Sequence, residues 1–466
     1  MESPSERPDA SPGSFRDPSG RVFKSDGRIF RQVNTRYAAT YDRLLQGGLY
    51  NTLVEQSLLV SHAEVAEPLG WPDERYKILE PDLIPFISYP FEWSFSQLKQ
   101  AAIATLRIQR LAIGHGMTLK DASAYNIQFK GTSPILIDTL SFEEWHEGTP
   151  WVAYRQFCQH FLAPLALMSR TEVRLGQLSR LFIDGVPLDL ASRLLPLRTR
   201  LRPSLLVHVH LHARAQSRHG LDTSKGRAAG FKRHAMMGLI DHLESAIDTL
   251  TVGGAGGPWA DYYDRTNYSP DAMADKQRVV GEFVERVRPG TVWDLGANTG
   301  AFSEITSAQG AYTIAFDGDA TAVERHFLDC QKRQDPHVLP LVMDLANPSG
   351  GMGWCHAERL SLIERGPADL VLALGLVHHL RITNQVPFTM VAECFERFGR
   401  ALVVEFPSPA DSQVRDMLAR VPAHAEGYTR EAFESAFADR FHVDAVHHIA
   451  GSERRLYLMR SKGLVI

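Results

Sequence analysis

Val-Trp-Asp-Leu-Gly-Ala-Asn-Thr-Gly, residues 292–300, is the stretch of this chain that decides the fold. An apolar strand runs into an acid, Asp294, and then into a glycine-spaced turn at the point where a helix should begin. Gly296 lets the backbone approach a ligand closely, and Gly300 lets the next helix pack onto the sheet. The pattern is typical of an open α/β sheet, in which ligands bind beyond the carboxyl ends of the strands.

The glycine spacing narrows the class of ligand. A dinucleotide-binding loop needs three glycines spaced Gly-x-Gly-x-x-Gly, and the residues after Gly296 do not supply that spacing. The pattern Asp294-x-Gly296-x-x-x-Gly300, with Asn298 inside the loop, instead resembles the first motif of class I S-adenosylmethionine (SAM) methyltransferases. The resemblance implies that these four residues line a SAM site. A simpler interpretation, in which the acid and the glycines only form a turn, stays open.

Carboxylates follow the next two apolar strands. Residues 312–316 end at Asp317, and this acid follows the glycine loop by about twenty residues, the offset at which a carboxylate meets a ribose. Residues 338–343 end at Asp344, which by the resemblance bonds the adenine amino group. The alternatives are that Asp317 caps a helix and that Asp344 belongs to an ordinary turn.

Strands alternate with helix-length segments through the rear half of the chain, which predicts a parallel sheet. The last two β-rich runs, residues 441–450 and 454–459, flank a Gly-Ser-Glu turn and predict an antiparallel hairpin. Class I methyltransferases end in such a pair. We therefore expect an α/β fold with a Rossmann-like class I methyltransferase sheet, parallel with an antiparallel terminal hairpin, over residues 259–466.

Polar residues at the carboxyl edge of this sheet are candidates for chemistry. A hydroxyl acceptor benefits from a nearby base, and our order of preference is His379, His378 and Glu405, which accompany the fourth and fifth strands. Packing or helix capping is an equally open role for the histidine pair. Tyr263 and Tyr268 precede the first helix, and their rings are candidates for a cation–π contact with the SAM sulfonium or for burial against the sheet.

The front of the chain carries a second pattern. Residues 21–34 predict a hairpin around Asp-Gly, residues 83–89 predict a strand, and residues 94–115 predict a helix. After the helix, four residues separate Asp121 from Asn126, and a short strand then leads to a further acid, Asp138. This order resembles the catalytic and metal-binding loops of kinase-like phosphotransferases.

The kinase-like resemblance implies that Asp121 orients a hydroxyl nucleophile while Asn126 and Asp138 hold magnesium with ATP. The chain departs from the family because it has neither a glycine-rich phosphate loop nor a Val-Ala-Ile-Lys strand. Arg31 and Glu55 are the candidates for the missing lysine–glutamate pair. We expect an α+β, kinase-like or substrate-recognition domain, and an interpretation of the loop residues as plain turn residues stays open.

The length of 466 residues exceeds the usual size of one core, so we expect two domains. The glycine-rich residues 251–258 predict a flexible linker. Residues 1–20 are rich in serine, proline and acids, which predicts a disordered tail and not a signal peptide. The front domain then spans residues 21–250, and the methyltransferase domain spans residues 259–466.

Composition limits the partners. A formal net charge of -4 gives no electrostatic reason to expect nucleic-acid binding. The four cysteines form no Cys-x-x-Cys pair, and no apolar stretch is long enough to span a bilayer, so we expect a cytoplasmic protein. His208, His210 and His212 alternate as zinc ligands would on a strand, but their helix-forming neighbours argue against it, and we expect no metal site. Residues 193–233 are locally basic, which fits a phosphate-bearing substrate or a solvated face.

These observations predict a SAM-dependent methyltransferase that acts on a small molecule or a glycan, by O-methylation. An Asn/Asp-Pro-Pro-Tyr loop, which accompanies amide and exocyclic amino acceptors, is absent after the fourth strand, where residues 374–377 read Leu-Gly-Leu-Val. The whole chain also resembles bacterial proteins related to host-specificity nodulation methyltransferases. Two alternatives stay open, a bifunctional kinase and methyltransferase that uses ATP and magnesium, and a non-catalytic SAM-binding protein. The sequence does not identify the acceptor, the base or the oligomeric state.

Overall fold

The computed structural model describes residues 10–213, 232–252, 268–421 and 427–464. The chain forms two compact units: unit 1 comprises residues 1–254 and 351–359, and unit 2 comprises residues 255–350 and 360–466. Most of the expected linker lies outside the described residues. In the described part of the segment expected as a tail, the Ser11 N–H donates to Val22 O at 2.8 Å, so this part is hydrogen-bonded to the fold.

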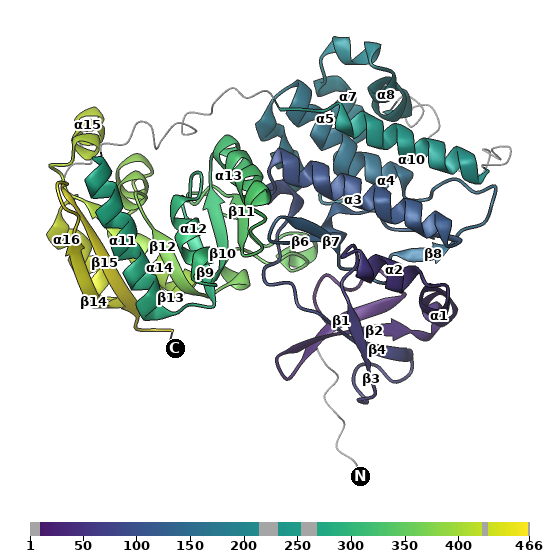
Figure 1. Cartoon of the computed structure of the whole chain (residues 1–466), viewed down its shortest axis with the longest axis horizontal. Coiled ribbons are helices and arrows are strands. Elements are labelled where there is room, and N and C mark those ends of the chain that lie inside the picture. The colour runs from purple at the N-terminus through teal and green to yellow at the C-terminus, as the bar shows by residue number, and fades with distance from the viewer. Residues whose placement is uncertain (1–9, 214–231, 253–267, 422–426, 465–466) are drawn as a thin grey trace. The chain divides into compact units, whose positions relative to one another are not determined.

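Unit 2 is built on a mixed sheet with the strand order β11-β10-β9-β12-β13-β15-β14 (Figure 1). The strands from β11 to β13 are parallel, whereas β15 pairs antiparallel with both β13 and β14. This is the arrangement of class I methyltransferases, and the predicted fold is confirmed. The strand bounds are β9 Thr291–Leu295, β10 Tyr312–Asp317, β11 Val338–Val342, β12 Ala368–Ala373, β13 Gly399–Pro407, β14 Phe441–His448 and β15 Arg454–Ser461.

Helices cover both faces of the unit 2 sheet, which is why its strands read as apolar runs. Val292 of β9 packs in a core cluster with Val280 of α11, whereas Trp293, the next residue, contacts the ring of Phe398 of α14. Successive strand residues thus face opposite layers. The helices are α11 Pro270–Val287, α12 Ala301–Ala308, α13 Ala320–Arg333, α14 Phe388–Phe398, α15 Ser412–Arg420 and α16 Arg430–Ala438.

Unit 1 is an α+β structure, as expected, with an antiparallel sheet of order β1-β2-β4-β3 and a larger helical part (Figure 1). The predicted hairpin forms, and Asp26 and Gly27 take the positive φ angles that its tight turn needs. The sheet strands are β1 Gly20–Ser25, β2 Arg28–Asn34, β3 His62–Val65 and β4 Arg75–Pro81. The other main elements are α1 Ala38–Gln46, α2 Leu49–Glu55, α3 Phe95–Gly114, β5 Met117–Leu119, β6 Ile127–Lys130, β7 Ser133–Leu136, β8 Phe142–Glu144, α5 Ala163–Arg170, α7 Leu188–Leu194 and α10 Arg233–Asp248.

One predicted strand is wrong. Residues 83–89 form no strand. The strand in this part of the chain is β4, which begins at residue 75, eight residues before the predicted start at residue 83. Pro85 has no N–H to donate to a ladder, and the segment buries Phe86 and Tyr89 without pairing. The predicted helix over residues 94–115 is confirmed as α3. Among the described residues, no helix has the length and apolar character needed to cross a membrane.

Candidate functional site

The loop after β9 is shaped by its backbone conformation. Gly296 and Gly300 have positive φ angles of 75° and 89°, and Asn298 between them has a φ of 52°. The N–H groups of Gly296 and Ala297 both donate to Phe316 O, at 2.8 and 2.9 Å. These bonds tie the loop to the end of β10, so the glycine loop and the acid at the end of β10 form one continuous edge.

Gly300 is required by packing as well as by its φ angle. A Cβ atom at residue 300 would lie 2.0 Å from Nε2 of His326, which comes from α13. Burial lowers the pKa of His326 to about 3, so its ring is neutral in this contact. By contrast, a Cβ atom at Gly296 would meet Leu376 at an ordinary 3.7 Å, so inside the protein only the φ angle demands glycine there.

Two predicted carboxylates lie at this edge in different environments. Asp317 accepts hydrogen bonds from the N–H groups of Asn298 and Asp319, each at 2.8 Å and each on a different oxygen. Each oxygen keeps a further lone pair for a ligand. Asp294 is 2% exposed and accepts from the Ser303 hydroxyl at 2.6 Å, and burial raises its pKa to about 6. Asp317 is therefore the carboxylate with remaining capacity, and Asp294 mainly supports the start of α12.

Asp344, the expected adenine contact, is exposed in the turn that follows β11. Its Oδ1 accepts from the Ala346 N–H at 2.9 Å, which is the turn geometry that the sequence left open. A Cβ atom at Gly318 would lie 4.0 Å from the Cα of Asp344. The structure thus brings the turns that follow β10 and β11 side by side, with Asp317 and Asp344 on neighbouring turns.

His378 and His379 follow β12 at the same edge of the sheet. His378 is 1% exposed, and neither of its ring nitrogens has a hydrogen-bond partner among the described residues. The centroid of its ring lies 4.2 Å from that of the half-buried His379. Burial lowers the pKa of both imidazoles, so both are neutral near pH 7. The ring nitrogens of His378 therefore keep hydrogen-bonding capacity for a further group.

Glu405 is fully buried and bound on both carboxylate oxygens. Lys276 Nζ donates at 2.6 Å and Arg454 Nη1 at 3.1 Å, and the Tyr268 hydroxyl also donates to it. The centroid of the Tyr268 ring lies 4.9 Å from Lys276 Nζ and 4.8 Å from Arg454 Cζ, so two protein cations contact this ring. Burial raises the pKa of Glu405, but the two cations outweigh this effect and lower it to about 2. Tyr263, the other aromatic candidate, lies outside the described residues.

The sequence patterns above do not single out Lys276 or Arg454. A signal was present, because Lys276 stands in the apolar stripe of α11 between Ala272 and Val279. Arg454 likewise shares one face of β15 with Leu456 and the other buried residues two positions apart. A long cation at a core position indicates a buried acid beside it, since a lone buried charge is too costly.

In unit 1 the loop before β6 and the turn after β7 lie together. Asp138 accepts from the guanidinium of Arg31 and from the Ser141 hydroxyl, the latter at 2.7 Å. Asn126 donates to the same hydroxyl at 3.3 Å. The structure thus brings Asn126 and Asp138 together around one serine. Arg31 pairs with Asp138, so the expected pair with Glu55 is wrong.

The remaining candidates of unit 1 have ordinary protein partners. Asp121 accepts from the Ser123 N–H at 2.9 Å and from the Gln156 amide at 2.8 Å. His208 and His210 lie in a helical segment and not in a strand, and each forms a hydrogen bond with a neighbouring hydroxyl group. Within the described ranges, no three His, Cys, Asp or Glu side chains are placed to hold a metal ion.

Comparison with known proteins identifies a relative of nearly the same length. The chain is 35% identical over 462 residues to nodulation protein NoeA of Rhizobium meliloti (strain 1021), and the match covers 97% of this chain and 96% of the relative. No family model matches the chain.

Solved structures resemble part of the chain at low scores. They include the N-methyltransferase NodS from Bradyrhizobium japonicum WM9 (13% identity, 41% of this chain and 98% of that chain, TM-score 0.31). They also include magnesium protoporphyrin IX methyltransferase from Synechocystis PCC 6803 with bound S-adenosylhomocysteine (SAH). That match has 17% identity, covers 44% of this chain and 92% of that chain, and has a TM-score of 0.31. A third is the bifunctional kinase-methyltransferase WbdD (14% identity, 45% of this chain and 43% of that chain, TM-score 0.31). Similarity at this level adds no evidence on activity.

Proposed function

The chain belongs to the family of the nodulation protein NoeA, and from the geometry of unit 2 we propose that it is a SAM-dependent methyltransferase acting on a hydroxyl of a small molecule or glycan. The observation that carries the proposal is the edge formed by residues 296–300 and the end of β10. There, the bonds from Gly296 and Ala297 to Phe316 O and the bond from the Asn298 N–H to Asp317 place an open glycine loop beside a carboxylate with free lone pairs.

The residues present fit SAM. The positive φ of Gly296 leaves its surface without a side chain for a close ligand, and Asp317 has acceptor capacity for ribose hydroxyls. Asp344, on the neighbouring turn, is our candidate for the adenine amino group. SAM supplies an electrophilic methyl group, so the protein chiefly has to align the two reactants and exclude water.

The acceptor side of the site is assigned to the histidine pair. An acceptor hydroxyl that donates to a ring nitrogen of His378 would give that buried imidazole a partner, and the hydroxyl would lose its proton to the neutral ring during transfer. Glu405 is a poor candidate for that base, because Lys276 and Arg454 lower its pKa to about 2 and occupy its oxygens. We therefore assign Glu405 to positioning and keep His379 and His378 as the catalytic candidates.

We further propose that residues 21–250 recognise the acceptor, and that the protein works in the cytoplasm, as its cysteine pattern favours. The activity is tested by incubating the full chain with SAM carrying a labelled methyl group and an extract of the source cells. Label should enter the small-molecule or glycan fraction, and His378→Gln should reduce it by about 100-fold while the affinity for S-adenosylhomocysteine (SAH) is unchanged. Label in protein or nucleic acid would refute the acceptor class. SAH binding without any transfer would favour the non-catalytic alternative.

A second candidate function is phosphotransfer in unit 1, favoured by the shared contact of Asn126 and Asp138 with Ser141. Magnesium would have to displace the Arg31 guanidinium from Asp138, which makes this the weaker proposal. Magnesium-dependent ATP binding in calorimetry that Asp138→Ala abolishes would support it. ATP binding that is absent, or that persists in the variant, would remove it.

A further inference from the structure

One turn of unit 1 exposes an unusual set of side chains. Residues 193–203 connect α7 to the helical segment that follows, and eight of these eleven residues are exposed. All eight are leucine, arginine or proline, and the segment contains no acid. Leu197 and Leu201 are 73% and 85% exposed, so most of each side chain faces solvent. We call residues 193–203 the Leu/Arg turn.

The Leu/Arg turn is anchored from within. Its buried residues are Leu195 and Thr199. The Thr199 hydroxyl donates to Pro196 O at 2.6 Å and bonds His210 Nε2 at 2.9 Å, and His210 Nδ1 in turn bonds the Ser192 hydroxyl at 2.8 Å. These bonds hold the turn in one conformation. The exposed leucines therefore point outward from a fixed support, and they are not collapsed onto the helices beneath them.

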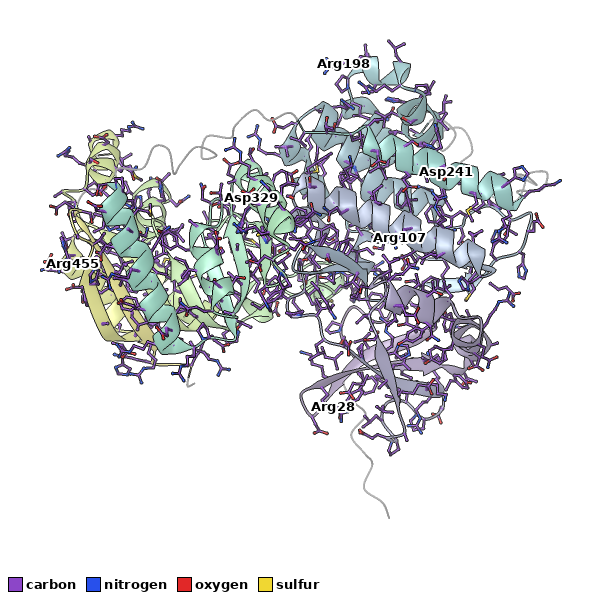
Figure 2. All side chains as sticks on the ribbon, viewed as in Figure 1. Arg28, Arg107, Arg198, Asp241, Asp329 and Arg455 are labelled. Carbon is purple, nitrogen blue, oxygen red and sulfur yellow. The ribbon has the colours of Figure 1, made fainter. Side chains whose placement is uncertain are left out.

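The charges of the Leu/Arg turn are uncompensated. Arg193 pairs with Asp189, but Arg198, Arg200 and Arg202 have no ion-pair partner among the described residues. Arg170, from α5, is close enough that burial and the charges of Arg202 and Arg198 lower its pKa. Gathering like charges costs free energy unless an anion is present. Figure 2 shows Arg198 on the outermost turn of the helical part of unit 1, directed away from it.

The chemistry of this surface selects its partner. Nucleic acid would use the arginines but leave the leucines in water, because it offers bases for stacking and phosphates for ion pairs. An apolar groove on a protein would accept the leucines without needing the surrounding arginines. An anionic bilayer accepts both, since leucines enter the acyl boundary while arginines stay at the phosphate level. We propose that the Leu/Arg turn docks unit 1 on the surface of a membrane that contains anionic lipids.

The test is cosedimentation of the full chain with vesicles of phosphatidylcholine alone and with about 30% phosphatidylserine. The wild-type chain should sediment only with the anionic vesicles, and raising the salt from about 0.1 M to about 1 M should release it. Leu201→Ser should reduce the partition about tenfold through lost apolar burial. Arg198→Glu should reduce it about thirtyfold, because it changes the charge by two units.

Two matched substitutions on unit 1 serve as controls. Leu83→Ser removes an exposed leucine (62% exposed), and Arg107→Glu reverses an exposed arginine on α3, well away from Arg198 (Figure 2). Both should bind vesicles like the wild type. The proposal is overturned if the wild type shows no preference for anionic vesicles, or if the turn variants bind no worse than their controls. It is also overturned if, without vesicles, the wild type self-associates in ultracentrifugation and Leu201→Ser abolishes this, because the turn would then join two copies of the chain.

Discussion

Asp317 and Asp319 lie close together in the sequence, but substitutions can distinguish what each carboxylate does. The Asp317 carboxylate accepts the Asn298 N–H, which shapes the glycine loop, and we propose that its remaining lone pairs accept from a ribose. Asp319 lies two residues later but caps α13 by accepting from the Thr321 N–H at 2.8 Å. The two acids therefore differ in what their removal should change.

Asp317→Ala should weaken SAM binding by about 1 to 3 kcal/mol, because ribose hydroxyls and the loop N–H lose their acceptor. Asp319→Ala should leave SAM affinity unchanged while it lowers the free energy of unfolding by about 1 kcal/mol, the value of a helix cap. Titration calorimetry with both variants decides the matter. Equal affinities of wild type and Asp317→Ala would refute the ribose assignment.

Asp294 should make unit 2 less stable at higher pH. Because burial raises its pKa from the ordinary 3.8 to about 6, the folded state binds this proton more tightly than the unfolded chain does. The stabilisation is fully present below pH 3.8 and is lost as the pH rises through 6.

Asp294→Asn keeps an acceptor for the Ser303 hydroxyl but cannot ionise, so it removes this pH dependence. Between pH 4 and pH 7 the wild type should lose about 2.5 kcal/mol relative to the variant, which is most of the effect of a shift of about two pKa units. Urea unfolding of both proteins at the two pH values measures the difference. Parallel stability curves would show that Asp294 titrates in its ordinary range in the folded protein.

At the scale of elements, α11, β13 and β15 are joined by the buried group of Lys276, Glu405 and Arg454. A buried ion pair contributes little beyond an apolar core, but removing one partner leaves the others charged and uncompensated. We therefore propose that Glu405 acts on the site through the position of its neighbours and not as a base.

Glu405→Gln should lower the stability of unit 2 by about 3 kcal/mol or more. Glu304→Gln is the matched control, because Glu304 pairs with Arg333 at the surface, where the loss should stay below about 1 kcal/mol. Hydrogen exchange of the β13 and β15 amides at increasing urea measures both variants. If the two substitutions cost the same, the buried group does not join these elements as we describe.

Sequence patterns predicted the elements of unit 2 well because local and tertiary preferences agree there. The run at residues 312–316 is apolar and forms β10, and the β-rich runs of residues 441–459 flank a turn and form β14 and β15. Residues 83–89 are also apolar but form no strand, and the charged segment of β4 takes the place in the sheet. The hydrophobic pattern of a segment predicts which of its residues are buried, but it does not predict whether the segment pairs in a sheet.

The candidate site was predictable only in part. The glycine loop and the acids follow strand ends, so their edge can be read from the chain. That Asp294 faces α12, that Asp344 bonds its own turn, and that Lys276 and Arg454 hold Glu405 depend on packing between segments far apart in sequence. Pair contacts of this kind have no local signature beyond a charge at a core position.

At the scale of the whole molecule, the two units are not simply consecutive segments. Residues 351–359 lie between β11 and β12 in the chain but belong to unit 1, where Glu358 pairs with Arg16 at 2.9 Å and Arg359 lies over the Tyr125 ring at 4.6 Å. The expected division at residues 250 and 259 does not foresee this. The polypeptide therefore passes between the units more than once, and both should be kept in any binding experiment.

The most direct test of the cofactor site is titration of SAH into the full chain by calorimetry, with Gly296→Val alongside the wild type. We predict one SAH bound per wild-type chain and none bound by Gly296→Val, because a β-branched residue at a φ of 75° distorts the loop and its side chain enters the ligand's path. The far-UV circular dichroism of the full chain should be unchanged in the variant. No heat from the wild type, or the same affinity in the variant, would contradict the account.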